Sequence, residues 1–377
     1  MFAIGAQNLP PLNQIPGAPA DIPADVPTAA PTQYTPLSFD TLTEGMLTAA
    51  TPTIVYRVDL PSAGRLTMSL SRTAQGALPN NGADVRWRDA NGVQMTSNLW
   101  GTGAFSRFMD LEAGTYFIEV ARRGNSTGSY FITASFFPAN NNEIEPNNSI
   151  HQAHTLTFDQ MVTGFISHQD PVDIYRVVLP SAGRLTMNLS RTAQGALPNW
   201  GVDVRWRDAN GIQMRSDGWG TGAFSRFMDL EAGTYFIEVA RRGSDTGSYF
   251  ITASFFAANN NEIEPNNNIQ QAQQLASGQS VTGFISHQDR VDIYRVVLPT
   301  ASRLTVNISR PAQGALPSFA VDVRWRDTNG IQLRSDSWGS GAFSRFMDLP
   351  AGAHFIEIAG RGGIDQTGSY ILTVTFP

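Results

Sequence analysis

Apolar and polar residues alternate along many short stretches of this chain, and the alternation predicts β-strands. Leu185, Met187 and Leu189 are separated by single polar residues, which is the period of two expected for a strand with one buried face. Six strands of this kind are predicted in the middle of the chain: Val172–Leu179, Arg184–Ser190, Val202–Arg207, Phe224–Leu230, Thr234–Ala240 and Ser248–Phe255. No amphipathic helical stretch of useful length accompanies them.

The turns between these stretches also favour antiparallel strands. Asp-Ala-Asn-Gly at 208–211 predicts a type I′ hairpin turn, in which both central residues need a positive φ. About eight short strands separated by turns every 8–12 residues indicate an antiparallel β-sandwich of jelly-roll type.

The whole pattern is repeated three times. The sequence Arg-Leu-Thr begins at Arg65, Arg184 and Arg303, and the spacing is 119 residues each time. This period is too long for a solenoid repeat and is the size of an independent domain. We therefore expect an all-β chain of three tandem antiparallel β-sandwich modules. Their predicted bounds are 35–138, 139–257 and 258–377.

Residues 1–34 precede the first module and contain seven of the 22 prolines. Such a composition predicts an extended, polyproline-like arm instead of a packed domain. The arm serves either as a spacer or as a segment that docks on another surface. Its first residues, MFAIGAQNLPPLNQ, lack the cationic start and apolar core of a Sec-type signal peptide.

Composition excludes several classes of protein. The net charge of −6 argues against nucleic-acid binding, which depends on a basic surface that neutralises phosphates. No apolar run approaches the 18 or so residues of a membrane-spanning helix. The chain has no cysteine and no lysine, so disulfides, thiol chemistry and Schiff-base catalysis are excluded.

Acidic residues gather at the two boundaries between modules. The segment Asn142–Asn148 reads Asn-Glu-Ile-Glu-Pro-Asn-Asn, and Asn261–Asn267 repeats it. About 25 residues later, each module carries a second acidic pair in the sequence His-Gln-Asp-x-Val-Asp. These pairs are Asp170 with Asp173 and Asp289 with Asp292.

Carboxylate and amide oxygens without any cysteine are the ligand set of a hard cation, and calcium takes six to eight of them. Four carboxylates that converge without a cation would repel one another strongly. The alternative is a solvated acidic linker beside an ordinary turn. On the residues alone, both interpretations stay open.

A longer set of motifs resembles a known family. Glu-Pro-Asn-Asn is followed by Gly164 and Ile166, by Asp-x-x-Asp-x-Tyr, by Ala-Gly-Arg-Leu at 182–185, and later by Ala-Gly-Thr-Tyr and Thr-Gly-Ser-Tyr. Together they resemble the bacterial pre-peptidase C-terminal domain, which is itself similar to the collagen-binding domains of clostridial collagenases. The similarity spans nearly all of modules two and three and most of module one.

The resemblance implies a secreted, non-catalytic β-sandwich that accompanies extracellular enzymes and binds calcium. Carried over to this sequence, the implied ligands are Glu143, Glu145, Asn147, Asp170 and Asp173 in module two, and Glu262, Glu264, Asn266, Asp289 and Asp292 in module three. Some relatives have aspartate at the positions of Asn148 and Asn267. These two residues are also candidates, and the weaker amide leaves open whether each site takes one or two ions.

Module one departs from this pattern. Moving the module-two ligands back by 119 residues leads to Ala24, Val26, Thr28, Thr51 and Ile54, none of which is a carboxylate. We therefore predict that module one binds no calcium.

No residue set supports catalysis. Asp245-Thr246-Gly247 matches the aspartic-protease signature, but that mechanism needs two aspartates that share a proton. The equivalent triplets begin with Ser126 and Gln366, so no pair can form and a turn is the better interpretation. The five histidines show no zinc-protease spacing.

Two groups of side chains are candidates for ligand binding. Trp100, Trp219 and Trp338 occupy Gly-rich turns, where an aromatic ring either stacks on a sugar or a collagen-like chain or caps the sandwich. The arginines at 205, 207 and 215 form either a basic stripe for acidic polymers or cross-strand pairs with Glu238 or Asp229, and we favour the pairs.

These observations predict a non-catalytic extracellular protein, secreted or at the cell surface, that is stabilised by calcium. The first hypothesis is a structural or adhesive repeat protein that self-assembles into fibres through its N-terminal arm. The alternative is a targeting region that directs a secreted hydrolase to collagen or polysaccharide.

Overall fold

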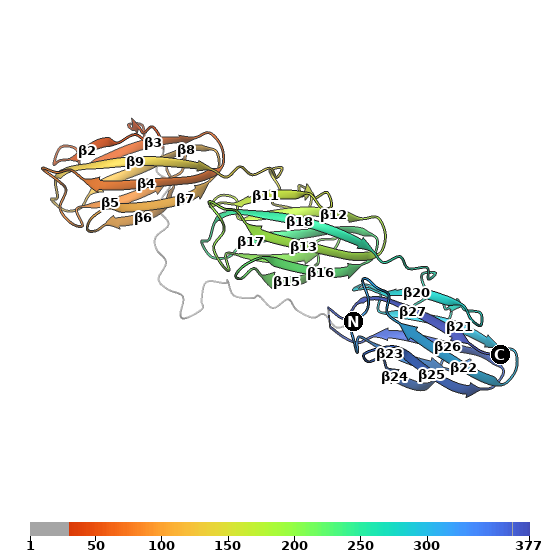
Figure 1. Ribbon diagram of the computed structural model, residues 1–377. Coiled ribbons are helices and arrows are strands. Elements are labelled where there is room, and N and C mark those ends of the chain that lie inside the picture. The colour runs from red at the N-terminus through yellow and green to blue at the C-terminus, as the bar shows by residue number, and fades with distance from the viewer. Residues whose placement is uncertain (1–29, 364) are drawn as a thin grey trace, which may run out of the picture. The chain divides into compact units, whose positions relative to one another are not determined.

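The computed structural model describes residues 30–363 and 365–377. Within these ranges no residue is helical, and the strands form six sheets. The sheets pair into three sandwiches, numbered 1 to 3 along the chain, each with a five-stranded and a four-stranded sheet (Figure 1). The predicted all-β fold of three sandwich modules is therefore confirmed. The predicted arm at 1–34 falls almost entirely outside the described residues.

Sandwich 1 consists of a five-stranded sheet in the order β1-β3-β8-β5-β6 and a four-stranded sheet in the order β2-β9-β4-β7. The two-residue strand β1 is parallel to β3, whereas β3, β8, β5 and β6 are antiparallel neighbours. The strands are β1 (Thr35–Pro36), β2 (Thr43–Leu47), β3 (Thr53–Leu60), β4 (Gly64–Arg72), β5 (Ala83–Arg88), β6 (Gln94–Trp100), β7 (Phe105–Leu111), β8 (Gly114–Arg122) and β9 (Gly128–Pro138).

Sandwich 2 repeats this topology, with the orders β10-β12-β17-β14-β15 and β11-β18-β13-β16. Its strands are β10 (His154–Thr155), β11 (Met161–Ile166), β12 (Val172–Leu179), β13 (Gly183–Arg191), β14 (Val202–Arg207), β15 (Gln213–Gly218), β16 (Phe224–Leu230), β17 (Gly233–Arg241) and β18 (Gly247–Ala257).

Sandwich 3 has the orders β19-β21-β26-β23-β24 and β20-β27-β22-β25. Its strands are β19 (Gln273–Gln274), β20 (Ser280–Ile285), β21 (Val291–Leu298), β22 (Ser302–Ser309), β23 (Val321–Arg326), β24 (Gln332–Ser337), β25 (Phe343–Leu349), β26 (Gly352–Gly360) and β27 (Gly368–Thr375).

The predicted period of two is visible in the burial of β13. Leu185, Met187 and Leu189 are buried, and the residues between them are partly exposed. These side chains meet those of β14, including Trp206, in one core between the two sheets. Burying each large apolar side chain stabilises the fold by about 1.5–3 kcal/mol, so the alternation itself holds the two sheets together.

The sequence pattern does not predict three strands of sandwich 2, namely β10, β11 and β15. Strand β10 has only two residues, which is too short for any periodicity. Gly164 interrupts the apolar pattern of β11. Strand β15 has no fully buried residue, because it lies at the edge of its sheet. Its sequence therefore lacks the alternation that buries one face.

The turn between β14 and β15 differs from the predicted type I′ turn. Only Gly211 has a positive φ, of 79°, and Asn210 does not. The Asp208 carboxylate accepts the backbone N–H groups of Asn210 and Ile212, at 2.9 and 2.8 Å. Register shifts between Trp206 and Arg207. The aspartate thus favours a turn that ends in one left-handed glycine beside a bulge.

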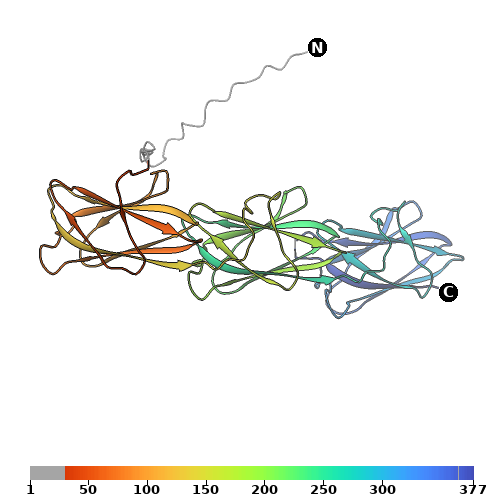
Figure 2. The ribbon, with the colours of Figure 1, turned by 90° about the horizontal axis from the view of Figure 1, so that it is seen from above.

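The described chain divides into two compact units. One is most of sandwich 1, and the other contains Phe137–Pro377 together with the short segments Ser62–Arg65 and Met109–Glu112. Sandwiches 2 and 3 therefore belong to the same unit. Within each sandwich, the strands of both sheets run along the long dimension of the module (Figures 1 and 2). The exact module bounds stay a prediction.

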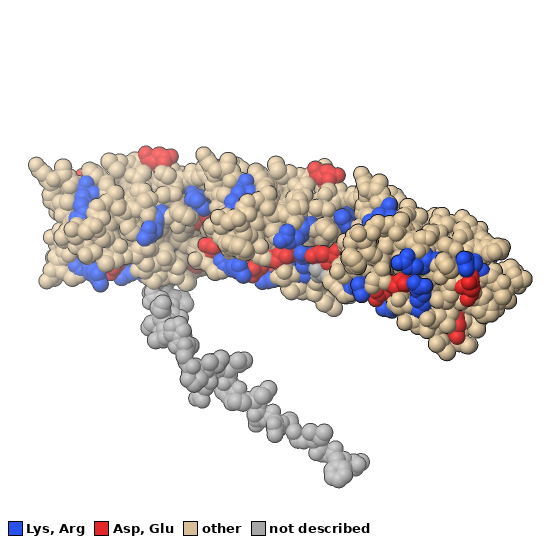
Figure 3. Space-filling view, turned by 60° about the horizontal axis from the view of Figure 1, so that its bottom comes forward, with Lys and Arg blue, Asp and Glu red and all other residues tan. Residues whose placement is uncertain are grey.

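Arginine and acidic side chains lie beside one another on the face shown in Figure 3. Arg205 and Arg207 both donate to the carboxylate of Glu238 on the neighbouring strand. Arg215 contacts Asp217 at 2.6 Å. The predicted cross-strand pairing is thus observed for Arg205 and Arg207, and partners of opposite charge favour such pairs across a sheet. Arg215 differs from the prediction, because its partner Asp217 lies on the same strand, β15.

Candidate metal centre

The acidic segment before sandwich 2 is fixed against strand β11. The Asn142 side-chain oxygen accepts the backbone N–H of Thr163 at 2.7 Å, and Asn142 N–H donates to the Thr163 carbonyl at 3.1 Å. One step along the chain, the Glu143 Oε1 atom accepts the N–H of Phe165 at 2.7 Å. These bonds pair the linker with the sheet edge and turn the Glu143 side chain inward.

The other oxygen of Glu143 is held by two further donors. The Tyr175 hydroxyl donates to Glu143 Oε2 at 2.6 Å, and the Asn147 amide donates to the same oxygen at 3.1 Å. Glu145 turns back on its own loop, where its Oε2 atom accepts the backbone N–H of Asn147 at 2.8 Å. The two glutamates are therefore placed side by side by hydrogen bonds from within the linker and from strand β12.

Asp170 and Asp173 approach from the start of β12. Asp173 is fully buried, and the Tyr249 hydroxyl on β18 donates to its Oδ2 atom at 2.5 Å. Asp170 accepts the Asn148 amide at 2.6 Å. The hydroxyls of Tyr175 and Tyr249 are themselves 2.7 Å apart. A tyrosine pair thus joins the buried carboxylates of the linker and of the strand.

Two buried oxygens at this cluster have no hydrogen-bond partner. They are Asn147 Oδ1 and Asp173 Oδ1, and both residues have 0% exposure. Ligand atoms of Glu143, Glu145 and Asp173 lie within 4.8 Å of one another. A buried polar atom without a partner is costly, and convergent oxygens of this kind are what a hard cation binds. The cluster could therefore hold a metal ion.

Burial and mutual repulsion alter the acidity of the cluster. Burial raises the pKa of Glu143 to about 7. Burial together with the charges of Asp170 and Glu143 raises the pKa of Glu145 to about 8. Burial also raises the pKa of Asp173 well above its usual range. Each shift reflects the cost of holding a negative charge here without a neighbouring positive charge.

Sandwich 3 contains a second copy of the cluster. Ligand atoms of Glu262, Glu264 and Asp292 again lie within 4.8 Å of one another. Asn266 Oδ1 and Asp292 Oδ1 are again buried without a partner. The Asn267 amide donates to Asp289 at 2.7 Å, as Asn148 does to Asp170. The unpartnered oxygens are therefore a repeated feature of the fold.

In sandwich 1, the described residues do not form such a cluster. Thr51 and Ile54 occupy the positions of the two aspartates, and the counterparts of the linker ligands, at 24, 26 and 28, lie outside the described residues. The tyrosine pair nevertheless persists, with the hydroxyls of Tyr56 and Tyr130 2.9 Å apart. That module one binds no calcium stays a prediction.

The candidate tryptophans lie in the cores of the sandwiches. Trp100, Trp219 and Trp338 are 2%, 1% and 2% exposed. Each indole N–H donates to the carbonyl of a glycine three residues later, for example Trp219 to Gly222 at 3.0 Å. These side chains present no free face to a sugar or a collagen-like chain, which agrees with the packing alternative.

The sequence analysis does not assign a role to the tyrosines of the cluster. Tyr175 belongs to the motif Asp-x-x-Asp-x-Tyr and Tyr249 to Thr-Gly-Ser-Tyr, so both are visible in the repeat. Their hydroxyls meet only because Gly164 leaves room for them. A Cβ atom on Gly164 would lie 2.4 Å from the Tyr249 ring and 2.5 Å from the Tyr175 hydroxyl. The glycine that recurs at this position, as Gly45, Gly164 and Gly283, is the sequence feature that could have indicated the tyrosine pair.

Comparison with known proteins gives one related sequence and several similar structures. No family model matches the chain. Collagenase ColA from Clostridium perfringens (strain 13 / Type A) is 24% identical over 180 residues, which is 44% of this chain and 16% of the collagenase. The match thus spans about one sixth of the length of that relative. It agrees with the collagenase-related resemblance, which stays a prediction at the level of the family.

Two solved structures illustrate the structural similarity. A crystal structure of the pre-peptidase C-terminal domain of a collagenase from Bacillus anthracis is 14% identical and aligns over 29% of this chain and 100% of its own, with a TM-score of 0.25. Tripeptidyl peptidase 2 is 10% identical and aligns over 89% of this chain and 33% of its own, also with a TM-score of 0.25. Such low scores carry no information about function.

Proposed function

We propose that the chain is a non-catalytic, extracellular array of β-sandwiches in which calcium fixes each acidic linker to the sandwich that follows it. The observation that carries this proposal is the pair of buried, unpartnered oxygens, Asn147 Oδ1 and Asp173 Oδ1, beside two further carboxylates. The same arrangement recurs in sandwich 3. A divalent cation would satisfy these oxygens and neutralise the cluster.

The donor set favours calcium over softer metals. Only carboxylate and amide oxygens are available, and the chain has no cysteine, so the ligands are those of a hard cation. In sandwich 2 the proposed ligands are Glu143, Glu145, Asn147, Asn148, Asp170 and Asp173. In sandwich 3 they are Glu262, Glu264, Asn266, Asn267, Asp289 and Asp292.

The proposed ligands come from separate stretches of the chain. Glu143 and Glu145 lie in the linker, whereas Asp173 is the second residue of strand β12. Binding of one ion to both stretches would order the linker as well as the sandwich, because a ligand that binds the folded arrangement more tightly than the separated segments stabilises that arrangement. A stiffened array suits a structural or adhesive protein, and self-assembly through the N-terminal arm remains part of this proposal.

A second candidate function is substrate targeting. The sequence similarity to a collagenase favours a region that directs a secreted hydrolase to collagen or a related polymer. The buried tryptophans are not suited to that contact in their present positions, so such binding would use the exposed faces of the sheets. Neither candidate uses a catalytic residue of this chain.

The two candidates differ in what the purified protein does with an insoluble polymer. Co-sedimentation with fibrillar collagen and with insoluble polysaccharides is measured in millimolar calcium, with EGTA as the matched control. Retention on one polymer that is lost in EGTA supports targeting. Formation of sedimenting assemblies without any polymer, together with no retention, supports the structural role. A protein that stays monomeric and binds no polymer contradicts both.

A further inference from the structure

An aspartate of sandwich 2 accepts a hydrogen bond from a threonine of sandwich 3. Asp229 on β16 is 1% exposed, and Arg184 donates to both of its carboxylate oxygens at 2.8 Å. The Thr367 hydroxyl donates to Asp229 Oδ2 at 2.8 Å, and the His287 N–H donates to the Asp229 carbonyl at 2.9 Å. The Arg–Asp pair is therefore a receptor for the threonine of the next module.

The same contact occurs once more within this compact unit, which also includes Ser62–Arg65 and Met109–Glu112. Asp110 is 0% exposed, and Arg65 donates to both of its oxygens at 2.8 Å. The Thr246 hydroxyl donates to Asp110 Oδ2 at 2.8 Å. The hydrogen bond from a threonine to an arginine-paired aspartate therefore occurs twice in the described structure.

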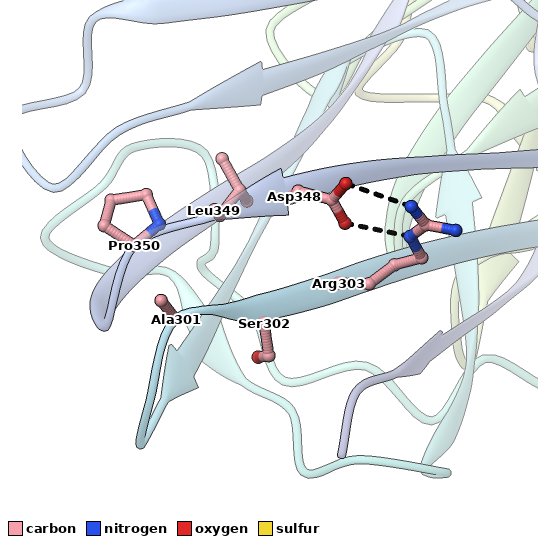
Figure 4. Close-up of a pocket in the computed structure, with 6 residues that line it drawn as sticks. All are labelled: Ala301, Ser302, Arg303, Asp348, Leu349 and Pro350. Atoms are coloured by element: carbon pink, nitrogen blue, oxygen red, sulfur yellow. Dashed lines mark hydrogen bonds and ion pairs between the residues drawn. The ribbon is translucent and has the colours of Figure 1, made fainter.

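Sandwich 3 carries the same Arg–Asp pair, and among the described residues no threonine hydroxyl donates to it. Arg303 donates to both oxygens of Asp348, at 2.8 and 3.0 Å, in the geometry of the two filled receptors. Here the side chains are 53% and 66% exposed. They line an open depression together with Ala301, Ser302, Leu349 and Pro350 (Figure 4). The acceptor is therefore formed and accessible.

Sandwich 1 carries the matching threonine. Thr127 is exposed, whereas Thr246 and Thr367 are 6% and 1% exposed. The loop that presents it has the same backbone as the two docked loops. Gly128 has a φ of 149°, and the next N–H, of Ser129, donates to the Gly76 carbonyl at 2.8 Å. The bonds after Thr246 and Thr367 are equivalent, at 2.7 Å each.

We propose that the Arg303–Asp348 receptor of one chain binds the Thr127 loop of a second copy. The contact would repeat, between chains, the hydrogen bond that the chain already makes twice within itself. Donor and acceptor belong to different sandwiches of the chain, so the interface is heterologous. Such an interface joins copies head to tail into an open-ended assembly unless the rotation closes a ring.

The inference deepens the structural role proposed above and rests on it, but the surfaces involved contain no proposed calcium ligand. Calcium binding and head-to-tail docking can consequently succeed or fail independently. Calcium-dependent melting of sandwiches 2 and 3 tests the first, and the concentration dependence of assembly tests the second.

Sedimentation velocity of the full chain over a concentration series tests the docking. Two variants remove one partner each, Thr127→Val and Asp348→Ala. Both side chains are exposed, so the variants should keep the wild-type melting temperature. The matched control is Thr115→Val, which removes a surface hydrogen bond to Asp59 of 2.6 Å elsewhere on sandwich 1.

The wild type and the control should form a growing series of species with concentration. Each docking variant should weaken association by about tenfold or more, because the lost hydrogen bond is to a charged group. An equimolar mixture of the two variants should restore one interface only and stop at dimers. Monomeric wild type at every concentration, or docking variants that associate like the control, would overturn the proposal.

Discussion

Removing calcium should lower the melting temperatures of sandwiches 2 and 3 and leave that of sandwich 1 unchanged. In the two acidic sandwiches, chelation leaves buried oxygens such as Asp173 Oδ1 and Asp292 Oδ1 without a partner, which lowers the free energy of unfolding. In sandwich 1, Ile54 occupies the equivalent position, so no charge has to be neutralised. The chain therefore contains its own control.

The size of the effect follows from mass action. A ligand present at 100 times its dissociation constant stabilises the folded state by about 2.7 kcal/mol. A site that binds with a constant of about 10 μM reaches this ratio at about 1 mM calcium. For a domain of roughly 100 residues, this free energy corresponds to a shift in melting temperature of roughly 10 °C.

Differential scanning calorimetry with millimolar calcium and with EGTA measures the shift. The variant Asp173→Asn separates the two sites, because it removes the buried charge of sandwich 2 while it preserves the shape of the side chain. Only the transition of sandwich 3 should then respond to EGTA. The reasoning is refuted if EGTA moves no transition, or if it moves all three by the same amount.

Three further predictions concern single residues. Burial raises the pKa of Glu143 from 4.5 to about 7, so between these pH values the folded calcium-free protein binds more protons than the unfolded chain, and its stability should fall as pH rises through this window. Urea titrations of the metal-free protein in calcium-depleted buffer at pH 5 and pH 8 check this, and equal stabilities would contradict it. Gly164→Ala should displace the tyrosine pair and weaken calcium binding, because its Cβ would lie 2.4 Å from the Tyr249 ring. Gly45→Ala makes the same clash in sandwich 1 and should lower the stability of that sandwich without changing calcium binding. A calcium titration of both variants distinguishes these outcomes. Trp219→Ala should destabilise sandwich 2 by about 3–5 kcal/mol, equally with and without calcium in calorimetry, and a normal melting temperature would show that the ring is not part of the core.

The sequence predicts the architecture because the 119-residue repeat indicates the number of modules and the alternation of apolar and polar residues follows the burial of each strand. Strands such as β12 and β14 bury one face against the core, and their predicted bounds agree with the structure. Edge strands are different. Strand β15 has no fully buried residue, so its sequence does not need apolar residues at every second position.

The candidate site is also partly predictable. Glu143 and Asp173 are found together as the acidic pattern predicts, although 30 residues separate them in the chain. The role of Tyr175 could not be predicted in the same way. Its hydroxyl bridges the linker and the strand only through the three-dimensional approach of Tyr249 and the room left by Gly164. The sequence places Tyr175 in a recurring motif but does not indicate which residues its hydroxyl meets.

Isothermal titration of the metal-free chain with calcium tests the central claim most directly. The account predicts saturable binding, with half of the sites lost in Asp173→Asn and none left when Asp292→Asn is added. Binding that is absent in the wild type, or unchanged in the double variant, would contradict the assignment of these acidic clusters as calcium sites.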